Sequence, residues 1–525
     1  MVMIIFDRVS FGYPAAKSTP VVHDLSFVLK GGEEVAVMGA NGCGKTTLGL
    51  LLAGIIKPDS GTITIQADEH DVEEKAARPA IGFLFQDPDN GLVATTVERE
   101  VAFSLENQNR PASDMRPVVD RTLDYFGMTR LRERSVWNLS GGEKQRLSLA
   151  GLFAYGPKIL FLDEPGSFLD YPGVKQLEDG LRRFKTGDPS LTIIRVTQYA
   201  HVADRYPRLF LMADGRIIRD DAPSRIFSDP GLLAGCRLRS PLRYLTPARE
   251  PSQVAPEPPK AEATEHPLVT IEDLHFAYEP DESDAIFREL SLTIRKGEVI
   301  GLIGPSGCGK STLAQILCGI YRPTGGRVRF ADPSSRAVMS FQQAERQFFC
   351  DTVHDEIAYG ISRDGKSDTA IGESVRTSMS MVGLDFESFK GRDPHTLSGG
   401  EARRLAFAIV VALPADLIIF DEPTCGLDEA GIGAFKKLVR WLNQAGKTIM
   451  IISHNSNIIA DLADRVALLQ DGRITETASA KTFFSMPEYK AILSTPEAIE
   501  YQLDNYGAVT TARAEDMFDR RHFYS

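Results

Sequence analysis

The chain has 525 residues, of which 43% are hydrophobic and 25% are charged. This length is several times the roughly 150 residues of a typical domain and predicts more than one domain, and the composition excludes a disordered, a collagen-like and a disulfide-rich protein. The formal net charge of -12 argues against a surface that follows the phosphates of DNA or RNA, so we expect no nucleic-acid partner.

The location of the protein is indicated by what its sequence lacks. No run of about 18 apolar residues occurs, and the N-terminal segment has neither the basic start nor the long apolar stretch of a signal peptide. We therefore expect a protein that neither spans a membrane nor is secreted. The six cysteines show no zinc-ligand spacing and no C-x-x-C pair, which fits a reducing cytoplasm.

A glycine-rich loop at residues 39–46, GANGCGKT, follows a short apolar run at 34–38 and precedes a helical pattern at 45–52. This order of strand, loop and helix is typical of a phosphate-binding loop, in which backbone N–H groups surround the phosphates at the positive end of the helix. We expect Lys45 to reach the β- and γ-phosphates of a nucleotide and the Thr46 hydroxyl to bind Mg²⁺.

The run KILFLDEP at 158–165 is a buried-strand pattern that ends in two carboxylates. It would place Asp163 and Glu164 at the carboxyl edge of a parallel sheet, beside the phosphate loop. Asp163 suits the Mg²⁺ shell. Glu164 is then positioned to orient or deprotonate an attacking water, which is the role of a general base.

The second half of the chain repeats these motifs in the same order. GPSGCGKS at 304–311 matches the first phosphate loop, IIFDEP at 418–423 matches the carboxylate strand, and LSGGEARR at 397–404 matches LSGGEKQR at 139–146. Two copies in register predict an internal duplication and argue against a chance glycine-rich turn. The expected counterparts of the loop and carboxylate residues are Lys310, Ser311, Asp421 and Glu422.

The repeat predicts two domains, at 1–235 and 268–482. Between them, seven prolines punctuate a stretch without apolar periodicity, which predicts an extended linker at 236–267. The tail at 483–525 contains helical-looking segments to which we assign no chemistry.

LSGGE is a rarer signal than the phosphate loop, and it identifies the family. With Ser140 and Ser398 opening the expected helices, the two copies resemble the ATP-binding cassette ATPases over roughly 4–218 and 269–474. The resemblance implies an α/β fold of two tandem P-loop domains, each a RecA-like core with an antiparallel β subdomain and a helical signature subdomain. In that family the signature of one cassette closes over the ATP held by the other, which implies an ATPase with two composite sites.

The resemblance also implies ATP and Mg²⁺ as cofactors and the residues that bind them. The nucleotide contacts expected in the first cassette are Tyr13, Gly39, Asn41, Gly42, Cys43, Gly44, Lys45, Thr46, Thr47, Gln86, Ser140 and Gly142. Those expected in the second are Tyr278, Gly304, Ser306, Gly307, Cys308, Gly309, Lys310, Ser311, Thr312, Gln342, Ser398 and Gly400. The Mg²⁺ ligands would be Thr46, Gln86, Asp163, Ser311, Gln342 and Asp421. Tyr13 and Tyr278 match the aromatic residue that stacks on adenine, and a core tyrosine is the alternative.

The catalytic residues implied by the resemblance are Glu164, Glu422, His454 and Gln198. His454 matches the family's switch histidine, whereas Gln198 stands at that place in the first copy. Glutamine can donate one hydrogen bond to a phosphate but cannot carry a positive charge or shuttle a proton. We hypothesise that the site with Glu164 hydrolyses ATP more slowly; the alternative is that glutamine suffices because Glu164 is intact. His201 is interpreted as a surface histidine.

Residues 83–107 and 340–360 are similar to the energy-coupling-factor and cobalt or nickel importer ATPases. This narrower resemblance implies that ATP hydrolysis energises import of a vitamin or a transition-metal ion. The implied partners are an integral-membrane scaffold subunit and a membrane subunit that captures the substrate, with this chain peripheral at the cytoplasmic face of the membrane. Acidic residues after each Q-loop would suit arginines of a partner, although a solvated helix face explains each of them equally well. They are Asp87, Asp89, Glu98, Glu100, Glu345, Asp351, Asp355 and Glu356.

Two other classes of twin-cassette ATPase remain open. Proteins of one class act on ribosomes or nucleic acid, and those that bind ribosomes usually join their cassettes by a long charged helix, from which the proline-rich linker departs. Proteins of the other class energise sugar import, and their second copy usually carries altered motifs, whereas here the second copy is the more complete. The sequence does not indicate the transported substrate, because no residue of this chain is expected to touch it.

Overall fold

A computed structural model describes residues 3–13, 20–66, 81–167, 169–236, 238, 241, 265–278, 285–362 and 367–486 of the chain. The chain divides into two compact units, Met1–Pro247 and Ala248–Ser525. Most of the predicted linker at 236–267 and of the predicted tail at 483–525 lies outside the described residues.

The first unit is built on a six-stranded sheet with the strand order β5-β6-β7-β3-β8-β9. The strands are β3 (Glu34–Gly39), β5 (Ile81–Leu84), β6 (Ile159–Asp163), β7 (Thr192–Val196), β8 (Arg208–Ala213) and β9 (Arg216–Asp221). All neighbours pair in parallel except β9, which joins β8 antiparallel at the edge. β6 and β7 are buried along their whole length, as expected for parallel strands covered on both faces.

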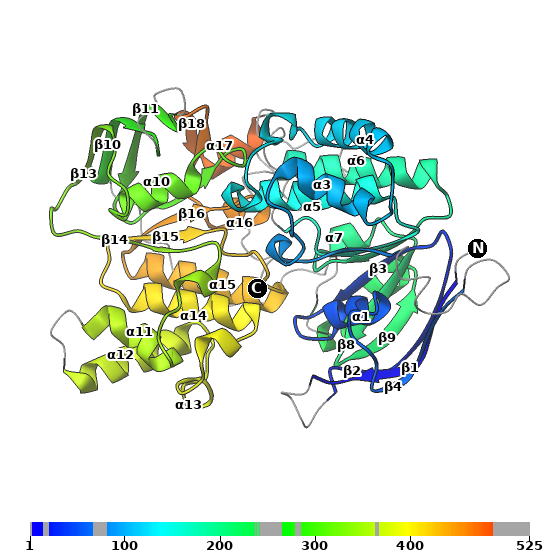
Figure 1. Cartoon of the computed structure of the whole chain (residues 1–525). Helices are drawn as coiled ribbons and strands as arrows, with labels where there is room; N and C mark the ends of the chain where they lie inside the picture. The colour runs from blue at the N-terminus through cyan, green and yellow to red at the C-terminus, as the bar shows by residue number, and fades with distance from the viewer. Residues whose placement is uncertain are drawn as a thin grey trace. The chain divides into compact units, whose positions relative to one another are not determined.

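A smaller antiparallel sheet and helix α1 (Lys45–Leu52) pack on one face of the six strands. The smaller sheet has the order β2-β1-β4 and consists of β1 (Met3–Phe11), β2 (Val22–Lys30) and β4 (Ser60–Gln66). Side chains from both sheets and from α1 form one buried apolar cluster, which includes Phe6, Leu48 and Phe161. Figure 1 shows the smaller sheet of the first unit in dark blue.

Helices that follow β5 share a second buried cluster with the sheet. α3 (Val97–Glu106), α4 (Ala112–Tyr125) and α5 (Gly141–Tyr155) contact one another and lie together in Figure 1. Their apolar side chains pack with residues of β6 and of α6 (Tyr171–Gly187), so the helical region is anchored to the sheet. The shorter helical elements described in this unit are α7 (Ala200–Ala203), α8 (Pro223–Phe227), α9 (Pro230–Gly235), η2 (Pro88–Asn90), η3 (Thr129–Leu131) and η4 (Val136–Asn138).

The second unit repeats this architecture, with a six-stranded sheet of order β14-β15-β16-β12-β17-β18 and a three-stranded sheet of order β11-β10-β13. Its strands are β10 (Pro267–Phe276), β11 (Phe287–Arg295), β12 (Val299–Ile303), β13 (Gly325–Phe330), β14 (Ala337–Ser340), β15 (Leu417–Asp421), β16 (Thr448–Ile452), β17 (Arg465–Gln470) and β18 (Arg473–Ser479). Its helices are α10 (Lys310–Leu317), α11 (Val353–Ser362), α12 (Asp368–Met381), α13 (Phe386–Phe389), α14 (Gly399–Ala412), α15 (Glu429–Gln444), α16 (Ser456–Leu462) and α17 (Ala480–Ser485), with short 3-10 turns η7 (Ala344–Gln347) and η8 (Pro394–Thr396).

The predicted fold class is confirmed. Each unit combines a largely parallel core sheet, a small antiparallel sheet and a helical region that carries the signature, as expected for tandem P-loop domains. Among the helices that the structure describes, none combines the length and the apolar character that a membrane span requires.

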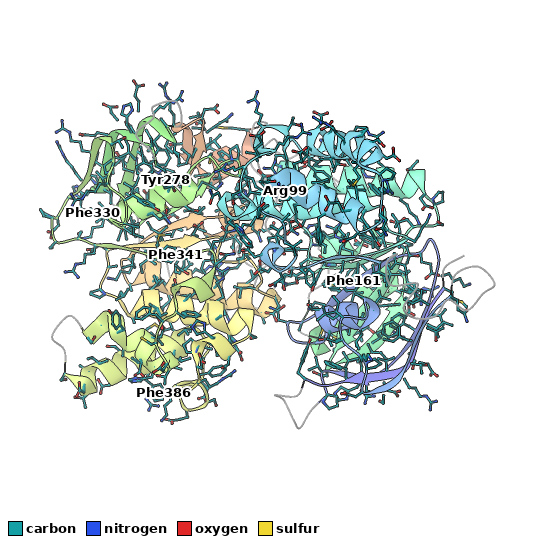
Figure 2. All side chains as sticks on the ribbon, viewed as in Figure 1. Arg99, Phe161, Tyr278, Phe330, Phe341 and Phe386 are labelled. Carbon is teal, nitrogen blue, oxygen red and sulfur yellow. The ribbon has the colours of Figure 1, made fainter. Side chains whose placement is uncertain are left out.

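Helix α1 lies directly on the sheet at Gly49. A Cβ atom at this position would lie 2.3 Å from Cε1 of Phe161 on β6, much closer than two carbon atoms can approach. Phe161, labelled in Figure 2, is fully buried. It stacks on Phe83 with ring centroids 5.1 Å apart, so its ring has no space to move. The matching pair in the second unit is Ala314 and Ile419, which share one buried cluster.

We predict that Gly49→Ala destabilises the first unit by about 1–3 kcal/mol, the usual cost of overpacking a core, although alanine is the better helix former. Calorimetric unfolding of the full chain measures this effect. Gly433→Ala on α15 is the matched control, because nothing lies within 4 Å of its Cβ position, and it should raise the unfolding temperature slightly. A Gly49→Ala chain as stable as the unaltered protein would contradict the packing described.

Candidate active site

Both phosphate loops connect the end of a central strand to the start of a helix. Gly44 and Gly309 form the N-caps of α1 and α10 with φ angles of 99° and 102°, a conformation that glycine adopts without steric cost. The other predicted loop residues lie in the same turn and in the first helical turn that follows. They are Gly39, Asn41, Gly42, Cys43, Thr46 and Thr47 in the first unit, and Gly304, Ser306, Gly307, Cys308, Ser311 and Thr312 in the second.

Each loop holds one buried lysine. Lys45 Nζ donates to the carbonyl oxygens of Gly39 at 2.8 Å and of Ala40 at 2.9 Å. Lys310 makes the two equivalent hydrogen bonds in the second loop, with the same lengths. Both lysines are buried, so each unit fixes one ammonium group against its phosphate loop.

The buried strands β6 and β15 end in the two predicted carboxylates. Asp163 and Asp421 are the last residues of these strands, and Glu164 and Glu422 follow with positive φ angles of 47° and 45°. A left-handed backbone is unfavourable for a residue with a Cβ atom and persists only where its surroundings fix it. Here the backbone N–H of each glutamate donates to a carbonyl of the neighbouring strand, at 3.2 Å on β7 and at 2.8 Å on β16.

The structure brings the hydroxyl and aspartate ligands predicted for Mg²⁺ together in both units. Thr46 Oγ1 donates to Asp163 Oδ2 at 2.6 Å, and Ser311 donates to Asp421. A hydroxyl and a carboxylate fit Mg²⁺, which prefers oxygen ligands and completes its shell with water and substrate phosphates. The described part of the chain contains no group of three or more His, Cys, Asp or Glu side chains that could hold a metal ion.

Burial raises the pKa of all four carboxylates. For Glu422, burial and the neighbouring Asp421 raise the pKa to about 7, while Lys310 acts in the opposite direction. A carboxyl group with this pKa can take up a proton near neutral pH, which is the property that a general base requires.

The side chain beside the glutamate differs between the units. Gln198 is buried, and its Nε2 atom donates to both carboxylate oxygens of Glu164, at 2.6 and 2.8 Å. In the second unit the backbone N–H of His454 donates to Glu422 at 3.1 Å, and His454 Nε2 lies 3.5 Å from Glu422 Oε1. Hydrogen bonds to a carboxylate favour its charged form, so Gln198 lowers the pKa of Glu164 against the effect of burial.

His201 is exposed on α7, in agreement with its interpretation as a surface residue.

The two Q-loop glutamines are held in different ways. Gln86 Nε2 donates to Glu164 Oε2 at 3.4 Å. In the second unit Arg403 on α14 donates to the backbone carbonyls of Phe341, at 3.0 Å, and of Gln342. Arg403 is buried, and sequence analysis missed it because the first copy has a glutamine at the matching position.

Both signature serines are exposed N-caps of helices. The Ser140 hydroxyl accepts from the N–H of Glu143 at 3.3 Å, and the Glu143 carboxylate accepts from the N–H of Ser140 at 2.8 Å. Ser398 and Glu401 form the same capping box at the start of α14. The predicted glycines of the signature follow in the first turn of each helix, as Gly142 and Gly400.

Two tyrosines lie beside the phosphate-loop helices. The hydroxyl of Tyr278 is 2.8 Å from Thr312 Oγ1, and that of Tyr13 is 3.4 Å from Thr47 Oγ1. Tyr278 is 57% exposed and Tyr13 is 38% exposed. This exposure next to a phosphate loop favours a stacking role over that of a core tyrosine.

Three acidic residues predicted to face a partner make internal contacts instead. Glu100 and Glu356 are buried, and each accepts two backbone N–H groups of the loop before its helix, at 2.6–3.0 Å. Asp89 pairs with the buried Lys144 of α5. The prediction is wrong for Glu100 and Glu356, because the loops before their helices need acceptors for their own N–H groups, and for Asp89, because its carboxylate pairs with Lys144 of the same unit.

Comparisons with known proteins agree with this geometry. The family described as ABC transporter matches residues 22–167 and 287–425. A putative ABC transporter ATP-binding protein of Methanosarcina acetivorans is 30% identical over 92% of this chain and 86% of its own, and one of Treponema denticola is 31% identical over 90% and 96%. The solved structure of the archaeal ribosome recycling factor aABCE1 with the ribosomal stalk protein aP1 covers 91% of this chain and 92% of that chain. Its TM-score of 0.61 and 21% identity show a similar fold.

The two matched segments together make up more than half of the chain, and each contains one phosphate loop and one carboxylate pair. The relatives named as ATP-binding proteins extend over nearly all of it. The chain therefore belongs to the ABC transporter family, as an ATP-binding protein with two cassettes and ATPase activity.

Proposed function

We propose that the two cassettes hydrolyse ATP with Mg²⁺ at two composite sites and thereby energise an importer in the membrane. The observation that carries this proposal is the repeated set of phosphate loop, hydroxyl and carboxylate pair, accompanied in each unit by an exposed signature serine. A serine hydroxyl and backbone N–H groups at a helix start suit a γ-phosphate. In the proposal, the signature of each cassette completes the site of the other.

The site residues divide the chemistry among them. The loop N–H groups bind the phosphates together with Lys45 and Lys310, and the exposed rings of Tyr13 and Tyr278 stack on adenine. The residues that would hold Mg²⁺ are Thr46, Gln86, Asp163, Ser311, Gln342 and Asp421. Mg²⁺ neutralises charge that develops on the transferred phosphate. Glu164 and Glu422 orient and deprotonate the attacking water.

We propose that the site with Lys310, Glu422 and His454 is the faster of the two. His454 can carry a positive charge next to a phosphate, which glutamine cannot. Gln198 donates to both carboxylate oxygens of Glu164. These hydrogen bonds engage lone pairs that the carboxylate would use to take a proton from water, so Glu164 is the weaker base.

A role in transport is supported by the names of the relatives, and a partner is supported by two loops that suit one. Val93 and Phe349 lie at equivalent places in the two units and are 61% and 63% exposed. The buried Glu100 and Glu356 fix the N–H groups of their loops, so both apolar side chains are presented on ordered backbone. The proposed partners are an integral-membrane scaffold of the energy-coupling-factor type and a subunit that captures a vitamin or a transition-metal ion. The chain would then act peripherally, at the cytoplasmic face of the membrane.

Purification of the chain from detergent-solubilised membranes tests the importer role. We expect an integral-membrane protein to co-purify with the unaltered chain and to be lost when Val93→Asp and Phe349→Asp are combined. Trp441→Asp on α15, also at an exposed residue, is the control that should retain the partner. Recovery of ribosomal proteins would contradict the importer role and favour the ribosome-associated class, and a partner that serves sugar uptake would favour the sugar-importer class.

Substitution of the two glutamates tests the difference between the sites. We predict that Glu422→Gln lowers the steady-state ATPase rate at least about tenfold, since a general base contributes roughly 10²–10⁴-fold, whereas Glu164→Gln retains most of the rate. In the Glu422→Gln background, Gln198→His should raise the remaining rate. Equal losses of ATPase activity from the two glutamate substitutions would show that the sites are equivalent.

A further inference from the structure

Tyr278 in the second unit belongs to a cluster of three aromatic rings. Its ring is nearly perpendicular to that of Phe276, at the end of β10, with centroids 5.1 Å apart and an angle of 82°. It is equally perpendicular to Tyr321, which follows α10, at 5.4 Å and 83°. Phe276 and Tyr321 also contact each other at 5.6 Å. Figure 2 shows Tyr278 beside α10.

The first unit has only two of these rings. Tyr13 contacts Phe11 at 5.0 Å and 86°, which matches the contact between Tyr278 and Phe276. Ile56 occupies the place of Tyr321, as the alignment of the two phosphate-loop helices shows. The tyrosine hydroxyl of the first unit also lies farther from its threonine partner, at 3.4 Å, than the 2.8 Å found in the second unit.

These differences affect how far the ring of the exposed tyrosine is restricted before nucleotide binds. Tyr278 is 57% exposed and Tyr13 is 38% exposed, so in both units nucleotide binding would have to fix the position of a ring that partly faces solvent. Edge-to-face contact with Tyr321 and the short hydrogen bond to Thr312 restrict that ring in advance, which lowers the entropic cost of stacking. Tyr13 lacks the contact that Tyr321 provides in the second unit.

We propose that Tyr321 is a positioning residue that makes the adenine site of the second cassette the tighter one. This inference rests on the proposed function, in which Tyr13 and Tyr278 stack on the base of ATP. Tyr321 acts through Tyr278 and does not itself touch the nucleotide. The first cassette, with Ile56, holds the adenine base more weakly. It therefore discriminates less between ATP and inorganic tripolyphosphate, which has no base.

A purely structural role is the competing explanation for Tyr321. Tyr321 and Ile56 both pack at the edge of buried apolar clusters, so either substitution could disturb the nearby phosphate loop. Inorganic tripolyphosphate separates the two explanations, because it presents phosphates to the loop but has no base to stack on Tyr278. Damage to the loop would weaken both ligands, whereas loss of positioning would weaken ATP alone.

The experiment measures each cassette separately in the full chain. The protein is photolabelled with a low concentration of 2-azido-ATP, and the labelled peptides of the two units are quantified by mass spectrometry. The concentrations of ATP and of tripolyphosphate that halve each label give the affinity of each site for each competitor. In the unaltered protein we expect the second cassette to bind ATP more tightly than the first.

Tyr321→Ile should weaken ATP binding in the second cassette roughly two- to tenfold, the range that one aromatic pair contact contributes. Tripolyphosphate binding there and ATP binding in the first cassette should stay unchanged. Tyr321→Phe keeps the perpendicular ring and should keep the affinity for ATP. Ile56→Tyr should tighten ATP binding in the first cassette.

A double substitution tests whether Tyr321 acts through Tyr278. Once Tyr278→Ala is present, Tyr321→Ile should have no further effect on ATP binding. Equal weakening of ATP and tripolyphosphate by Tyr321→Ile, or no change in either, would overturn the inference. Failure of ATP to compete at either cassette of the unaltered protein would instead refute the proposed function, so the two failures are distinguishable.

Discussion

Two buried carboxylates next to one buried lysine govern the electrostatics of each cassette. Asp163 and Glu164 are 2% and 7% exposed, and Lys45 is 7% exposed. Two negative charges against one positive charge are costly to bury, and the raised pKa values of the carboxylates express that cost. A triphosphate adds more negative charge, which the N–H groups of the loop and, in the proposed function, a Mg²⁺ ion would offset. The loop, the hydroxyl and the glutamate with its left-handed backbone recur as one set in both units.

Around this constant set the two copies have diverged. The glutamate is hydrogen-bonded by a glutamine side chain in one unit and by the backbone of a histidine in the other. Among the residues that the structure describes, the exposed tyrosine has one aromatic neighbour in the first unit and two in the second. The second cassette has the fuller aromatic packing, whereas the first has the shorter hydrogen bonds to its glutamate. These two differences are the physical basis for the proposed inequality of the sites.

The parts predictable from sequence are those that local chain chemistry decides. The phosphate loops, the carboxylates at strand ends and the serine N-caps each follow from a few consecutive residues, and the fold class follows from their order. The parts not predictable depend on contacts between distant segments. Arg403 reaches carbonyls of Phe341 and Gln342, more than 60 positions earlier in the chain. Glu100 and Glu356 look like surface residues in the sequence, and only the path of the preceding loop shows that they are buried acceptors.

The most direct test asks whether each cassette completes the site of the other. Each signature serine is replaced by arginine, and the steady-state ATPase rate of the full chain is measured. Ser140 belongs to the first unit, yet in a composite arrangement it completes the site of Lys310 and Glu422 in the second. We therefore predict that Ser140→Arg abolishes most of the ATPase rate and that Ser398→Arg costs much less. A greater loss from Ser398→Arg, or full activity in both variants, would contradict the composite arrangement.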